Sequence, residues 1–132
     1  MKKIKLFDPF TNESEKNAIK QIFDSHFWAS GGGVGKVQKF EEKFSKYTSS
    51  KSCVAVNSGT AALNLALSMY NIKNKEVIIP SLSFVSTANA VIENGGIPKF
   101  VDIDERTLCM DPEKILKVIS KKTKIILPVH FG

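Results

Sequence analysis

The second half of the chain alternates short apolar runs with segments of helical spacing, and this alternation limits the possible folds more than any other feature. The pattern repeats about every 23 residues. Parallel strands need crossover connections of about this length, and strands covered on both faces are apolar throughout. The sequence therefore predicts an α/β fold with a parallel βαβαβαβ sheet and right-handed crossovers. The expected strands are residues 53–56, 76–80, 99–103 and 124–129, and the expected helices are 60–70, 84–93 and 112–120.

The first fifty residues have a different pattern. Apolar side chains recur at spacings of three and four in residues 17–27 and 37–47, which predicts two helices. A run with three consecutive glycines, Ser30–Gly35, separates them. We therefore expect a helical N-terminal segment at 1–50 and an α/β domain at 51–132. Because Gly132 directly follows the last expected strand, that domain is expected to be an incomplete piece of a truncated or split gene product.

Composition narrows the class of protein. The 132 residues carry a formal net charge of +6, and the positive residues are spread along the chain instead of clustered as in most nucleic-acid binders. The two cysteines lack metal-ligand spacing, and neither a signal peptide nor a membrane span is recognisable. We expect a reduced cytoplasmic protein without nucleic-acid or membrane partners, whose charge suits an anionic small molecule.

Ligands of open parallel sheets bind at the carboxyl ends of the strands. At the first such end, Asn57–Thr60, a glycine lets the backbone approach a ligand closely. The free amides of the next helical turn and the Thr60 hydroxyl are suited to a phosphate group. The alternative is an ordinary helix cap by Ser58 or Thr60 with nothing bound. The motif is not a P-loop, because the Gly-Lys-Ser/Thr ending is absent.

The other strand ends also carry candidate residues. Phe84 is placed to stack on a flat ring, or else it is a core residue behind a Ser83 cap. Asp102 and Asp104 are spaced like the metal-binding Asp-x-Asp of glycosyltransferases, or else they form a turn. His130, a lone histidine at the last strand end, is typical of a structural residue.

Taken in order, these segments resemble the DegT family of sugar aminotransferases, which have the aspartate-aminotransferase fold and use pyridoxal 5′-phosphate. The likeness covers nearly the whole chain. It rests on residues 32–33, 37–41, 56–67, 76–80, 83–91, 100–104, 122–124 and 128–132.

The resemblance implies roles for individual residues. Gly59 and Thr60 match the pair that grips the cofactor phosphate, with Ser58 beside them, and Phe84 matches the aromatic that stacks on the pyridine ring. The Asp102 region matches a turn. The Schiff-base lysine and the aspartate that pairs with the pyridine nitrogen are expected beyond Gly132. Five lysines lie in predicted loops and helix ends, and none of them is expected to replace the Schiff-base lysine. They are Lys36, Lys51, Lys73, Lys75 and Lys121.

The resemblance also implies a fold-type-I large domain and a transfer of an amino group from an amino acid, commonly glutamate, to a keto group on a nucleotide-linked sugar. Complete family members are homodimers, and a minority are dehydratases. We expect this chain to be inactive alone. Two alternatives stay open: a non-catalytic fragment or half of a split enzyme, and a metal-dependent sugar-nucleotide binder that uses Asp102 and Asp104.

Overall fold

The computed structural model describes residue 5 and residues 7–28 and 35–131. It groups the chain into two compact units, Met1–Ala55 and Val56–Gly132, which are described separately. The domain division predicted between residues 50 and 51 stays a prediction. Residues 29–34, which include the three consecutive glycines, lie outside the described part of the chain. Within the described residues, no helix has the length and apolar character needed to cross a bilayer.

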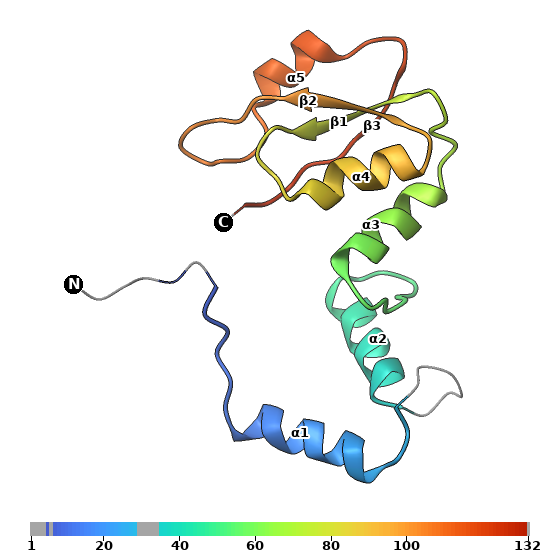
Figure 1. Cartoon of the computed structure of the whole chain (residues 1–132), viewed down its shortest axis with the longest axis vertical. Helices are drawn as coiled ribbons and strands as arrows, with labels where there is room; N and C mark the ends of the chain where they lie inside the picture. Colours follow the sequence, from blue (N-terminus) through green and yellow to red (C-terminus); the bar gives the residue numbers. More distant parts are fainter. Residues whose placement is uncertain (1–4, 6, 29–34, 132) are drawn as a thin grey trace, which may run out of the picture. The chain divides into compact units, whose positions relative to one another are not determined.

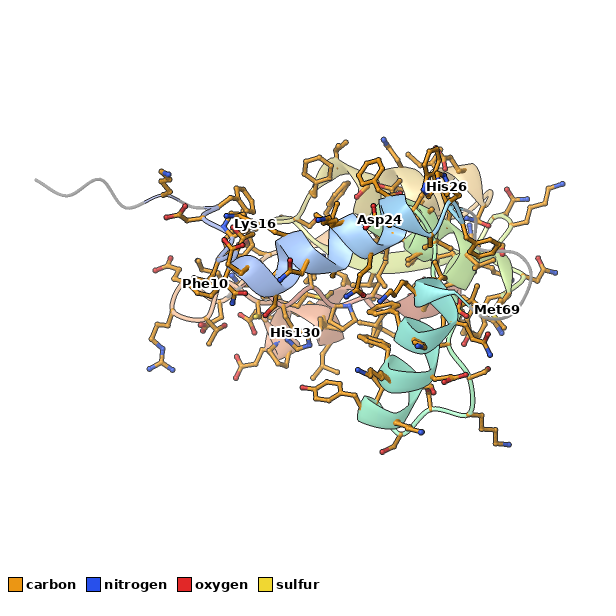
Figure 2. The ribbon with its side chains drawn as sticks, turned by 90° about the horizontal axis from the view of Figure 1, so that it is seen from below. Phe10, Lys16, Asp24, His26, Met69 and His130 are labelled. Carbon is orange, nitrogen blue, oxygen red and sulfur yellow. The ribbon has the colours of Figure 1, made fainter. Side chains whose placement is uncertain are left out.

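The first unit contains helices α1 (Glu13–Asp24) and α2 (Lys36–Tyr47). α1 begins earlier than the apolar spacing predicts, because Asn12 and Glu15 form a capping box. Figure 2 shows Phe10 and Lys16 near the start of this helix and Asp24 and His26 at its end. Neither helix has a fully buried residue, so both present apolar side chains to the surface.

The second unit is a three-stranded parallel sheet with helices on both faces (Figure 1). The strand order is β2-β1-β3, so β1 is central and pairs in parallel with both neighbours. Each strand is followed or preceded by a helix, as a parallel sheet requires. The elements are α3 (Gly59–Ser68), β1 (Glu76–Pro80), α4 (Val85–Glu93), β2 (Ile97–Val101), α5 (Pro112–Val118) and β3 (Thr123–Ile126).

The core lies on the two faces of β1. Val77 and Ile79 pack on one face with buried residues of α3 and α4, and Ile78 packs on the other with Val101 and Met110. Side chains of α5 cover this second cluster, and α4 and α5 lie on opposite sides of the strands in Figure 1. The period-2 alternation of a strand thus supplies two small cores from one five-residue segment.

The predicted α/β class and parallel sheet are confirmed, but one strand was predicted wrongly. Residues 53–56, which were expected to be a strand, form none in the structure. The reason is that a strand exists only through ladder hydrogen bonds to a neighbour, and apolar character does not supply that neighbour. β2 and β3 also bury only part of their residues, unlike β1, because each has a single neighbouring strand.

A polar cluster around Glu76, at the amino end of β1, connects β1 with β2 and with the start of β3. The Glu76 carboxylate, only 16% exposed, accepts hydrogen bonds from Ser120 Oγ at 2.6 Å, Thr123 Oγ1 at 3.2 Å and Lys99 Nζ at 3.2 Å. The bond from Ser120 is the main cause that lowers the pKa of Glu76 below its ordinary 4.5, against the opposing effect of burial. The folded state is therefore stabilised when Glu76 is ionised.

This cluster predicts a pH dependence of stability. Because the pKa of Glu76 is lowered on folding, its contribution is fully present above the ordinary value of 4.5 and is lost as pH falls through the folded-state pKa. We expect Glu76→Gln to flatten the decline of unfolding free energy with acidification below pH 4.5, as measured by urea titrations followed by circular dichroism. Glu105→Gln, at an exposed position, is the matched control and should keep the wild-type slope. An unchanged slope in Glu76→Gln would contradict the assignment.

Candidate functional site

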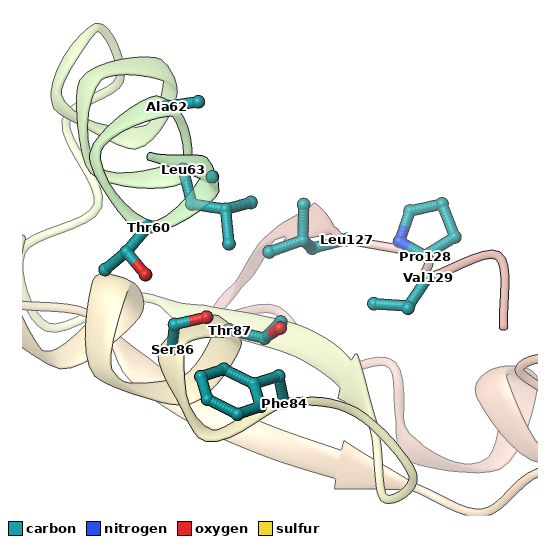
Figure 3. Close-up of a pocket in the computed structure, with 10 residues that line it drawn as sticks. Thr60, Ala62, Leu63, Phe84, Ser86, Thr87, Leu127, Pro128 and Val129 are labelled. Carbon is teal, nitrogen blue, oxygen red and sulfur yellow. The ribbon is translucent and has the colours of Figure 1, made fainter. Parts of the chain in front are cut away.

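A pocket opens at the carboxyl side of the sheet in the second unit (Figure 3). Its volume is about 670 Å³, within the range of about 300–1,000 Å³ typical of small-molecule sites. It is formed by the first turns of α3 and α4 and by the segment that follows β3. The lining residues are Gly59, Thr60, Ala62, Leu63, Phe84, Ser86, Thr87, Leu127, Pro128 and Val129.

The first turn of α3 supplies free hydrogen-bond donors. Ser58 is the N-cap, and its Oγ accepts from the Ala61 amide at 3.1 Å. The amides of Gly59 and Thr60 make no hydrogen bond to any described residue. A Cβ placed on Gly59 would meet no atom within 4 Å, so there is open space beside this backbone. Free amides at a helix N-terminus with room in front of them are suited to an anion.

The structure shows the helix cap at the Asn57–Thr60 motif and, beside it, amides that remain free. Ser58 acts as an ordinary helix cap and does not line the pocket, whereas Gly59 and Thr60 do. The cap uses the amide of Ala61 and leaves the two earlier amides unbonded. Capping and anion binding therefore do not compete for the same donors.

Phe84 lies at the start of α4 with its ring on the surface. It is the N-cap residue, and its extended backbone turns the chain from β1 into the helix. The side chain is 75% exposed, so the alternative of a core residue does not hold. Figure 3 shows the ring among the pocket residues. An exposed aromatic face at the rim of a pocket is suited to stacking on a flat ligand.

Hydrogen bonds between side chains fix α3 and α4 relative to each other. Asn94 Nδ2 donates to Asn64 Oδ1 at 2.9 Å and to the Ala90 carbonyl at 2.8 Å, and Asn64 Nδ2 donates to the Glu93 carboxylate. These contacts join the middle of α3 to the end of α4. Their position leaves the first turns of both helices free to line the pocket.

Asp102 and Asp104 serve a turn and an ion pair. Lys114 Nζ lies 3.0 Å from Asp102 Oδ2, and this bond is the main cause that lowers the pKa of Asp102. The Asp104 carboxylate accepts from the amides of Thr107 and Arg106, which lower its pKa. Among the described residues, no group of three or more metal-ligating side chains comes together. The geometry therefore gives the metal-binding hypothesis no support.

The remaining candidates lie outside the pocket. β3 ends at Ile126, three residues before the predicted strand end, and His130 is exposed beyond it. His130 is not among the residues that line the pocket, and its interpretation as structural stays a prediction. In the described part of the chain, no lysine lines the pocket.

Sequence reasoning missed part of the pocket wall. Ser86 and Thr87 follow Phe84 on α4, and Leu127 and Val129 follow β3. Thr87 is three residues after the N-cap Phe84, a spacing that places both at the start of α4. That spacing was visible in the sequence. The approach of Leu127 to α3 and α4 depends on the packing of β3 against β1, which no local motif reports.

Comparison with known proteins gives a consistent result. The model of the DegT/DnrJ/EryC1/StrS aminotransferase family matches residues 9–132. The chain is 44% identical over 125 residues to the spore coat polysaccharide biosynthesis protein SpsC of Bacillus subtilis (strain 168), covering 94% of this chain and 31% of that protein. It is 37% identical over 131 residues to the GDP-perosamine synthase of Escherichia coli O157:H7, covering 98% and 35%.

A solved structure with a similar fold is a GDP-4-keto-6-deoxymannose-3-dehydratase with a trapped PLP-glutamate geminal diamine. It superposes with a TM-score of 0.84 at 30% identity, over 96% of this chain and 34% of that one. The chain thus spans about a third of the length of the relatives that it matches. These matches confirm the resemblance drawn from the sequence motifs. The chain belongs to the DegT/DnrJ/EryC1/StrS aminotransferase family.

Proposed function

We propose that this chain is the cofactor-holding part of a pyridoxal 5′-phosphate-dependent aminotransferase that acts on a nucleotide-linked keto sugar. The observation that carries the proposal is the joint presence, in one pocket, of free helix amides at Gly59 and Thr60 and an exposed aromatic face at Phe84. A phosphorylated pyridine needs both an anion site and a flat apolar surface. The pocket offers the two together.

The chain's own residues have distinct tasks in this proposal. The amides of Gly59 and Thr60 and the Thr60 hydroxyl bind the phosphate, supported by the positive end of the α3 dipole. Ser58 holds the first turn of that helix in shape through its cap bond. Phe84 orients the ring by stacking, and the apolar side chains of Leu63 and Leu127 limit access of water. When bound, the cofactor supplies the electron sink for moving an amino group between an amino acid and a ketone.

The names of the relatives guide the proposed substrates. SpsC is named for spore coat polysaccharide biosynthesis and the Escherichia coli protein for GDP-perosamine synthesis. We therefore propose a role in amino-sugar biosynthesis for polysaccharides, with an amino acid as amine donor. We also propose that the complete enzyme is a cytoplasmic homodimer without nucleic-acid or membrane partners.

We place the catalytic lysine of the complete enzyme outside residues 1–132. No described lysine lines the pocket, and relatives are about three times as long. We expect the chain to be inactive alone and to work as the first part of the enzyme or together with a separately encoded segment. After incubation with pyridoxal phosphate and borohydride reduction, no lysine should be labelled stoichiometrically in a peptide map.

Binding of pyridoxamine 5′-phosphate tests the cofactor site directly. This probe lacks an aldehyde, so it does not react with the many surface lysines. Equilibrium dialysis should show that it binds roughly 10- to 100-fold more tightly than pyridoxamine, because charge-assisted hydrogen bonds to the phosphate are lost in the latter. Equal affinity for the two probes, or no binding of either, would refute the proposed phosphate site.

A further inference from the structure

Thr87 is a buried polar residue whose hydroxyl has no hydrogen-bond partner among the described residues. It is the only polar side chain among the fully buried residues that the structure describes, with 5% exposure. Its hydroxyl makes no hydrogen bond to any described residue, although its amide donates to the Phe84 carbonyl at 3.0 Å. Buried side-chain oxygens are nearly always hydrogen-bonded. This hydroxyl therefore requires an explanation.

The hydroxyl is open in one direction. Among the described residues, no completely buried side-chain oxygen or nitrogen lacks a partner, so the small exposed part of Thr87 includes its unbonded oxygen. Thr87 lines the pocket, and Figure 3 shows its side chain among the pocket residues. A helical threonine commonly turns its hydroxyl back to the carbonyl four residues earlier, but here no such bond forms. The hydroxyl faces the pocket instead.

The pocket wall around Thr87 is mostly apolar, with two further hydroxyl side chains at Thr60 and Ser86. Leu63 and Leu127 line the same pocket and pack against the core beneath it. Thr87 lies in the first turn of α4, three residues after the N-cap Phe84, whose carbonyl accepts from the Thr87 amide at 3.0 Å. It therefore places a hydroxyl group in the pocket wall beside an exposed aromatic ring. Small-molecule pockets use a small number of such polar groups to fix the orientation of a ligand.

We propose that the Thr87 hydroxyl is a positioning group for the flat ring that stacks on Phe84, to which it makes a hydrogen bond at a polar atom on the ring edge. This inference rests on the proposed function and adds a second anchor to it. The phosphate is held at the first turn of α3, and the ring is oriented at the first turn of α4. The ligand class is a phosphorylated aromatic heterocycle with a hydrogen-bonding substituent.

Three probes and two matched variants separate the two anchors. Pyridoxamine 5′-phosphate has both ring and phosphate, pyridoxamine has the ring alone, and inorganic phosphate has the anion alone. Thr87→Val and Thr60→Val make the same change, replacing a hydroxyl by a methyl group, at the proposed ring anchor and phosphate anchor. Dissociation constants are measured on the full chain by NMR titration, and thermal unfolding verifies that each variant is folded.

Thr87→Val is expected to weaken binding of pyridoxamine 5′-phosphate and of pyridoxamine by about 3- to 10-fold, the value of one hydrogen bond, and to leave phosphate binding unchanged. Thr60→Val should weaken the phosphate-bearing probes and leave pyridoxamine unchanged. Thr87→Ser, which keeps the hydroxyl and removes the methyl group, should restore wild-type binding of the ring. A role in packing alone would not be restored by serine.

Other outcomes overturn one proposal or both. If Thr87→Val binds all three probes as the wild type does while Thr60→Val is impaired, the role of Thr87 is wrong and the proposed function stands. If Thr87→Val loses affinity for inorganic phosphate as well, the hydroxyl belongs to the anion site and the ring-anchor assignment is wrong. If the folded wild-type chain binds none of the probes, both proposals fail.

Discussion

Replacing Phe84 by alanine is expected to weaken binding of pyridoxamine 5′-phosphate roughly 30-fold, equivalent to about 2 kcal/mol. The reason is that the exposed ring offers the pocket's one aromatic face among its described lining residues, and alanine removes both its apolar area and its stacking energy. Because the ring is not part of the core, the variant should unfold at nearly the wild-type temperature. Equilibrium dialysis and a thermal melt measure the two quantities.

Phe100→Ala is the matched control for this experiment. Phe100 is also an exposed phenylalanine, but it lies on β2 and does not line the pocket. Its removal should leave affinity for the probe unchanged. An equal loss of affinity in both variants would mean that removing any exposed phenylalanine weakens binding. An unchanged affinity in Phe84→Ala would exclude Phe84 as the stacking residue.

Ile79→Ala should lower the free energy of unfolding by about 2–5 kcal/mol. Ile79 is fully buried in the central strand, where it packs with residues of both α3 and α4. The loss is a large fraction of the roughly 5–15 kcal/mol typical of folded domains, so the variant is expected to be partly unfolded at 37 °C. Urea titration of the full chain measures the change through the midpoint at constant slope.

Ile97→Ala makes the same chemical change at the edge of the sheet. Ile97 is 47% exposed on β2, which has β1 as its single neighbour. We expect a cost of about 1 kcal/mol or less, because less area is lost and solvent fills the space. A cost at Ile97 equal to that at Ile79 would show that the core is not centred on β1.

The central strand could be predicted from sequence because its signals agree. Residues 77–80 are apolar, bounded by turn residues and buried on both faces, and the predicted and observed limits of the strand, 76–80, coincide. β2 begins two residues earlier than predicted, at Ile97, and includes Pro98. A proline lacks an amide donor and is tolerated in a strand that has a neighbour on one side only. Whether a strand lies at an edge is set by tertiary structure, so the first residue of β2 could not be predicted from the local sequence.

Residues 53–56 show the opposite case. Their apolar character resembles that of β1, yet no described strand pairs with them. Pairing depends on segments distant in sequence, which local periodicity does not report. The candidate site likewise has some features that local motifs predict and others that depend on tertiary packing. Gly59, Thr60 and Phe84 follow recognisable motifs and line one pocket, whereas the exposed state of Phe84 and the unbonded hydroxyl of Thr87 required the packed structure.

The Glu76 cluster also has a consequence for the order of assembly. Its partners Lys99 and Thr123 are 23 and 47 residues away along the chain. Closing the longer loop costs about 0.6 kcal/mol more in chain entropy, as for any doubling of length. The β1–β2 pair is thus the cheaper contact to form first during folding. β3 then pairs with the free edge of β1. The Glu76 carboxylate thus bonds to residues of both later strands and is satisfied only when both loops have closed.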